Sequence, residues 1–120
     1  SNGIESNPHE NTMRAPLAWA AEKASDPALR DLARLRLASV MLDDKAYDEA
    51  LAQLQTAPDE SLAARFADLK GDILVAQGKK EEARAAYKTV VSSLESATKA
   101  ESVTLREIAQ AKLDAVGGAQ

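Results

Sequence analysis

Apolar residues recur along most of this chain with the period of an α-helix. The pattern is clearest over residues 80–95, where apolar side chains stand at offsets of 0, 3, 4, 7, 8 and 11: Ala83, Ala86, Tyr87, Val90, Val91 and Leu94. Spacing of this kind predicts an amphipathic helix. No stretch shows the strict alternation of a β-strand. The pattern therefore predicts an all-α fold of six helices, over residues 13–24, 27–43, 46–56, 60–77, 80–95 and 104–116.

Capping and turn residues indicate where several of these helices begin and end. Asp26 is expected to cap a helix whose first residue is Pro27, because proline fits the first helical position. Gly78 is expected to close the fourth helix in the left-handed conformation. Thr104 and Glu107 have the spacing of a capping box, which predicts that the last helix begins there.

The first 11 residues are polar and show no period. Pro8 could open a helix, but Pro16 stands too close for a long uninterrupted helix to begin there. We therefore predict an irregular tail over residues 1–11. Connections of two to eight residues favour antiparallel neighbours, so residues 12–118 are predicted to form a single domain of helical hairpins, an α-solenoid.

Two similar segments, residues 44–50 and 77–83, follow each other at a distance of 33 residues. Each lies between two apolar-periodic stretches and ends in alanine. A period of this length, made of two helical segments, is typical of stacked helical hairpins. Arrays of this kind usually bind other proteins. The pattern therefore favours a binding function over a catalytic one.

The two hairpins resemble tetratricopeptide repeats over about residues 31–95. In that pattern a small residue precedes an alanine by twelve positions, and the pairs here are Ala38 with Ala50 and Gly71 with Ala83. A large residue four positions after the alanine fills the gap between helices, here Leu54 and Tyr87. The chain departs from the consensus at the turn glycine, the early tryptophan and the late proline, which are replaced by Lys45, by Arg34 and Ala67, and by Leu62.

The order of several longer segments resembles the bacterial YfgM family over roughly residues 13–116. These segments are Leu29-Arg30, Leu35-Arg36-Leu37-Ala38, Tyr47-Asp48-Glu49-Ala50-Leu51, Asp68-Leu69-Lys70-Gly71-Asp72-Ile73-Leu74, Gly78-Lys79, Ala83-Arg84-Ala85-Ala86-Tyr87, Leu105-Arg106-Glu107 and Lys112-Leu113. Members of this family are tetratricopeptide proteins described as ancillary subunits of the SecYEG translocon. The resemblance implies a transmembrane helix followed by a periplasmic repeat domain, which associates with the translocon and with a membrane-anchored periplasmic chaperone (PpiD). It also implies that this chain is the C-terminal part of such a domain.

Composition excludes several function classes. The net charge of −4 and a pI near 5 argue against a nucleic-acid surface. The absence of cysteine excludes a disulfide framework and a thiolate metal site. No apolar run approaches the roughly 18 residues of a membrane span. Because Ser1-Asn2-Gly3 is similar to a scar from tag removal, we expect a soluble fragment whose membrane anchor is absent.

Residues with catalytic or metal-binding chemistry are few. His9 is the only histidine and stands in the predicted tail, which favours a solvated residue over a zinc ligand or a member of a Ser/His/Asp constellation. Two carboxylate pairs, Asp43-Asp44 and Glu81-Glu82, stand in turns or at a helix start. Carboxylates at such positions are stabilised by the helix dipole, which favours a structural role over general acid–base catalysis. No enzymatic activity, metal or cofactor is therefore expected.

The repeat pattern places a candidate surface for protein partners. Tetratricopeptide arrays present the first helix of each hairpin on a concave face, which suits a bound peptide or helix. Counting from the aligned repeats gives the predicted partner-binding surface: Leu32, Leu35, Ser39, Leu42, Asp43, Arg65, Asp68, Asp72, Val75 and Ala76. Its leucines could equally belong to the core. Trp19 is expected to pack the first helix against the second hairpin rather than to anchor a partner.

Two functions remain in competition. The first is a non-catalytic protein–protein interaction scaffold at the periplasmic face of the inner membrane, which links the SecYEG translocon to periplasmic chaperones. The second is a self-associating repeat module, because a terminal repeat without its neighbour exposes an apolar face.

Overall fold

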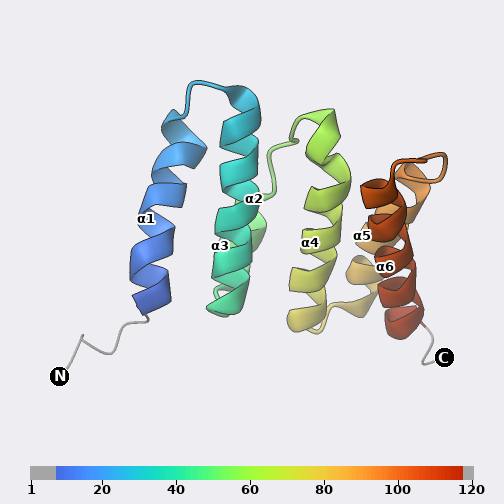
Figure 1. Ribbon diagram of the computed structural model, residues 1–120. Helices are drawn as coiled ribbons and strands as arrows, with labels where there is room; N and C mark the ends of the chain where they lie inside the picture. Colours follow the sequence, from blue (N-terminus) through green and yellow to red (C-terminus); the bar gives the residue numbers. More distant parts are fainter. Residues whose placement is uncertain (1–7, 118–120) are drawn as a thin grey trace. The chain divides into compact units, whose positions relative to one another are not determined.

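The computed structural model describes residues 8–117, which form an all-α structure as predicted (Figure 1). Six α-helices and one 3-10 helix occur among these residues, and no strand does. The chain divides into two compact units, residues 1–59 (unit 1) and residues 60–120 (unit 2). The single domain predicted over residues 12–118 stays a prediction. None of the helices in the described part has the length and apolar character of a membrane span.

Unit 1 is organised around its second helix, which packs against the other two. Its helices are α1 (Pro8–Lys23), α2 (Pro27–Asp43) and α3 (Tyr47–Gln53). Asp26 caps α2, because its Oδ1 accepts a 2.9 Å hydrogen bond from the backbone N–H of Ala28. Ala38 of α2 and Ala50 of α3 have no exposed surface. Their small side chains allow the two helices to approach closely, as the repeat pattern predicted.

Unit 2 is organised around α5, which packs against α4 and α6. Its elements are the 3-10 helix η2 (Glu60–Leu62), α4 (Ala63–Ala76), α5 (Lys80–Ser93) and α6 (Ala100–Gly117). Ile73, Leu74 and Val90 are its largest fully buried side chains. Gly71 and Ala83, the counterparts of the small pair in unit 1, are buried as well.

The turns within the two hairpins have the same construction. Lys45 has a φ of 65° and Gly78 a φ of 79°, so both are left-handed. The backbone N–H of the next residue reaches back to a carbonyl five positions earlier: Ala46 to Met41 at 2.8 Å, and Lys79 to Leu74 at 2.9 Å. This pattern satisfies carbonyls that a helix C-terminus leaves free. The left-handed conformation predicted for Gly78 is confirmed, and Lys45 adopts it despite its side chain.

We expect the substitution Lys45→Gly to stabilise the protein. A left-handed residue with a Cβ costs roughly 1–2 kcal/mol, part of which glycine returns through its greater freedom in the unfolded chain, so the net gain is about 0.5–1 kcal/mol. The urea midpoint followed by circular dichroism measures this gain. Gly78→Ala is the matched control and should lower the midpoint. A lower midpoint for Lys45→Gly would show that the lysine side chain makes a compensating contact.

The first helix begins earlier than the sequence predicted. α1 starts at Pro8, inside the stretch expected to be irregular, and continues through Pro16. Pro16 does not break the helix, contrary to the prediction. Its fixed φ is close to helical, and its cost is one missing N–H and local crowding with the preceding turn. Residues 1–7 lie outside the described part of the chain.

The last helix also begins early, so the capping box predicted at Thr104 is wrong. The backbone N–H of Val103 donates to the carbonyl of Lys99 at 2.9 Å, which places Thr104 inside α6. Ala100 has a high helix propensity, and Glu101 is favoured at the positive end of the helix dipole. The other helices agree with their predicted ranges to within three residues.

Candidate functional site

The predicted partner-binding surface lies at the solvent boundary of each unit. None of its ten residues is buried, and five of them are exposed: Ser39, Asp43, Arg65, Val75 and Ala76. The leucines among them are partly buried, so they belong neither to the fully buried core nor to the open surface. Exposure makes these residues available to a partner, and their role in binding stays a prediction.

Asp68 and Asp72 of this surface are both held by a lysine from α6. Nζ of Lys112 lies 3.1 Å from Oδ2 of Asp68 and 3.0 Å from Oδ1 of Asp72. The Tyr87 hydroxyl donates a 2.7 Å hydrogen bond to Oδ1 of Asp72, and Nζ of Lys112 lies 5.7 Å from the centre of the Tyr87 ring. The cluster therefore ties α4, α5 and α6 together. The sequence contains only one part of this cluster as a local pattern, a pair of carboxylates four positions apart on one helix, which repel each other and are favoured by a nearby cation. It does not indicate which cation that is.

The surroundings of the cluster shift three pKa values. Burial, and then the hydrogen bond to Asp72, raise the pKa of Tyr87. Burial also raises the pKa of Asp68, against the opposing effect of the Lys112 ammonium. Burial acts to lower the pKa of Lys112, but the hydrogen bonds to Asp72 and Asp68 and their charges outweigh it, so that this pKa is raised.

We expect these shifts to destabilise unit 2 in alkali. Tyr87 and Lys112 have ordinary pKa values of 10.0 and 10.5, and both are higher in the folded state. Their stabilisation is thus complete below these values and is lost as the pH rises through the folded-state pKa values. The contribution of Lys112 is reduced by solvent, because its side chain is 32% exposed. Urea denaturation between pH 7 and pH 12 measures the loss, to be compared between wild type and the Tyr87→Phe/Lys112→Met variant.

The double variant should be less stable than wild type at pH 7 and should lose less stability in alkali. Lys70→Met is a matched control, because Lys70 is an exposed lysine on the same helix as the two carboxylates. If wild type and the double variant lose the same amount of stability in alkali, the loss does not come from this cluster.

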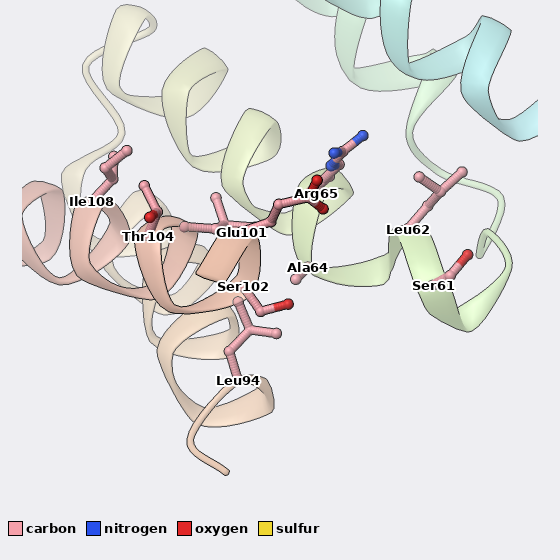
Figure 2. Close-up of a pocket in the computed structure, with 10 residues that line it drawn as sticks. Ser61, Leu62, Ala64, Arg65, Leu94, Glu101, Ser102, Thr104 and Ile108 are labelled. Atoms are coloured by element: carbon pink, nitrogen blue, oxygen red, sulfur yellow. The ribbon is translucent and has the colours of Figure 1, made fainter. Parts of the chain in front are cut away.

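A hollow of about 450 Å³ lies in unit 2 where α4 and α6 begin (Figure 2). Its size is within the range of ligand pockets, roughly 300–1,000 Å³. Aliphatic side chains form much of its lining: Leu62, Leu94, Leu105 and Ile108. Arg65 comes from α4 and Glu101 from α6. Of these, only Arg65 was in the predicted surface. Ile108 is 47% exposed, and helical periodicity alone does not reveal this exposure.

Trp19 of α1 does not pack as predicted, since 64% of its surface is exposed. It lines a hollow of about 340 Å³ in unit 1, together with residues of α2 and α3 that include Arg34 and Leu37. α1 presents partly buried alanines, among them Ala20 and Ala21, while it packs against α2. A contact made by small residues is too narrow for an indole, which explains why Trp19 remains outside it.

The structure also places the residues that carry candidate catalytic or metal-binding chemistry. Among the described residues, no group of three histidine, cysteine or acidic side chains could hold a metal ion. One member of each carboxylate pair is in an ion pair: Asp44 lies 3.3 Å from Arg14, and Glu81 lies 3.7 Å from Arg84. The side chain of His9 lies outside the described ones.

Comparison with known proteins identifies the family. The tetratricopeptide repeat-like domain family matches residues 5–118. A protein of Neisseria gonorrhoeae (strain ATCC 700825 / FA 1090) described as "Ancillary SecYEG translocon subunit" is 35% identical over 100 residues, which cover 83% of this chain and 46% of the relative. A protein of Escherichia coli (strain K12) with the same description is 39% identical over 79 residues, 66% of this chain and 38% of the relative. No solved structure matches the chain.

The chain spans less than half the length of these two curated relatives. Their shared description confirms the resemblance that the ordered segments indicated. The family match covers nearly the whole chain and agrees with the helical hairpins of both units. The chain therefore belongs to the tetratricopeptide repeat-like family, where its relatives are ancillary SecYEG translocon subunits.

Proposed function

We propose that this chain is a non-catalytic interaction domain that binds subunits of the SecYEG translocon and links them to a periplasmic chaperone. The observation that carries this proposal is the shared description of the two relatives as ancillary translocon subunits. The resemblance of the sequence to that family implies a location at the periplasmic face of the inner membrane.

The structure supports a role in binding through the surface it exposes. The ten residues of the predicted partner-binding surface combine aliphatic and charged side chains, and none of them is buried. Such a mixture suits a helix or peptide laid along the first helix of a hairpin. In unit 2 this surface includes Val75, which is 42% exposed although it is aliphatic.

Capture from detergent-solubilised inner membranes tests the proposal. The immobilised domain should enrich translocon subunits over a column without protein. Val75→Glu on α4 should reduce the enrichment several-fold, because a charge replaces an aliphatic contact. Ala85→Glu is the matched control, since Ala85 is exposed on α5, outside the predicted surface. The proposal fails if the wild-type domain enriches no translocon subunit, and the assigned surface fails if the two variants behave alike.

Self-association is a second candidate function, favoured by the apolar surface of unit 1. Met13, Trp19 and Leu29 are 40%, 64% and 54% exposed, and apolar side chains of this size gain free energy when a partner covers them. Sedimentation over a hundredfold range of concentration should then show a monomer–dimer equilibrium that Trp19→Ser weakens. A monomer at every concentration would exclude this function for the chain.

A further inference from the structure

The hollow between α4 and α6 combines an apolar lining with two charged side chains. Leu62, Leu105 and Ile108 give it aliphatic walls, and Ile108 is 47% exposed. Aliphatic surface that remains half in contact with water gains free energy when a partner covers it. Arg65 and Glu101 reach the hollow from α4 and α6 respectively (Figure 2).

The two charged side chains at the hollow form no ion pair with each other or with another described residue. Two other arginines of unit 2 do have partners. Arg84 lies 3.7 Å from Glu81, and Arg106 donates to the carbonyl of Leu94 at 2.8 Å. Among the described residues, neither Arg65 nor Glu101 has an opposite charge within ion-pair distance. A partner can therefore pair with both groups without breaking an existing ion pair.

Hydroxyl groups complete the lining of the hollow. Ser61, Ser102 and Thr104 lie beside the aliphatic walls, and the hydroxyls of Ser102 and Thr104 can exchange hydrogen bonds with a peptide backbone. This lining has an aliphatic surface, a few polar groups and one charge of each sign. It is therefore complementary to a protein segment with an aliphatic side chain and two opposite charges. The electrostatic part of this match selects the partner more than it strengthens binding.

We propose that the hollow between α4 and α6 binds an aliphatic side chain of a partner protein that is flanked by one acidic and one basic residue. The acidic residue pairs with Arg65, the basic residue pairs with Glu101, and the aliphatic side chain lies between Leu105 and Ile108. The inference rests on the proposed interaction function and assigns one binding subsite to it. The occupant is a short segment of a protein, because the hollow offers side-chain and backbone partners rather than a concentrated charge.

Synthetic peptides and charge reversal test this subsite. The probes are Ac-Gly-Glu-Ser-Leu-Ser-Lys-Gly-NH2, its reverse order Ac-Gly-Lys-Ser-Leu-Ser-Glu-Gly-NH2, and a version of each with serine in place of leucine. Nuclear magnetic resonance titration of the isotope-labelled chain gives the affinity and the amides that shift. We expect the wild type to bind one order about three- to fivefold more tightly than the other, as exposed ion pairs allow. The largest shifts should occur at Leu105 and Ile108, and the peptides without leucine should lose measurable affinity.

The double swap Arg65→Glu/Glu101→Arg should reverse the preferred order. Glu107→Arg is the matched control on α6, because Glu107 is exposed and does not line the hollow; this variant should keep the wild-type preference. Equal affinity for both orders, no detectable shift at millimolar peptide, or shifts away from Leu105 and Ile108 would overturn the proposal. Its failure is distinct from failure of the proposed function, which is decided by capture of translocon subunits with the wild-type domain.

Discussion

Replacing Gly71 with alanine is expected to destabilise unit 2 by about 1–3 kcal/mol, although alanine is the better helix former by roughly 1 kcal/mol. The physical reason is overlap with the Tyr87 ring. A Cβ at position 71 would stand 2.7 Å from Cδ1 and 2.8 Å from Cζ of Tyr87. That ring is buried and its hydroxyl is bound to Asp72, so it cannot move aside freely. Urea denaturation of Gly71→Ala gives the loss directly.

The first hairpin supplies the control for this prediction. There the small residue is Ala38, and the large residue that matches Tyr87 is Leu54. Hence Gly71→Ala should cost much less in a Tyr87→Leu background, with a coupling energy of about 1 kcal/mol or more between the two positions. Additive losses would contradict the close approach of Gly71 and Tyr87 as the origin of the effect.

Replacing Arg106 with methionine is expected to cost about 2 kcal/mol, because charged hydrogen bonds are individually worth roughly 1.5–3 kcal/mol. Its Nη1 donates to the carbonyls of Leu94 and Glu95 at 2.8 and 3.0 Å, which lie at the C-terminal end of α5. The positive charge is also favoured there by the helix dipole. The guanidinium therefore fastens α6 to the end of α5, while methionine keeps only the aliphatic length.

Hydrogen exchange is the suitable measurement, because it separates local from global opening. Relative to wild type, Arg106→Met should increase the exchange rates of the α6 amides more than those of the α2 amides, since α2 lies in unit 1. Arg36→Met is the matched control, since Arg36 is an exposed arginine of α2 and its replacement should leave α6 unchanged. Protection of α6 equal to that of the wild type would show that packing alone holds this helix.

Helical periodicity and turn chemistry were sufficient for most of the fold. The Asp26-Pro27 pair placed the start of α2 correctly, and Gly78 predicted a left-handed turn that the structure contains. The small residues at positions 38, 50, 71 and 83 are all buried. Helices that pack closely require small residues at their contact, so the sequence indicates where such contacts lie. These features are local or repeat at a fixed distance, which is why one sequence revealed them.

Features that depend on distant parts of the chain were not predictable. Lys112 is 44 positions from Asp68, and no local pattern indicates that they meet. Trp19 was expected to pack because it stands among apolar residues of its helix. Periodicity alone does not show whether a side chain lies inside a helix contact or beside it. The hollow beside Arg65 is formed together by residues of η2, α4 and α6 and by Leu94, which follows α5. The role of the predicted first-helix residues in binding stays a prediction, whereas the structure was needed to show which charged side chains form ion pairs.

Site-specific photocrosslinking in cells tests the interaction function most directly. A photoreactive amino acid is placed at Ser39 or Val75 of the protein produced in cells, and at Ala85 or Thr89 of α5 as matched exposed controls. The account predicts crosslinks to a translocon subunit from the first two positions and much weaker ones from the controls. Crosslinks to translocon subunits from α5 alone, or from none of the four positions, would contradict it.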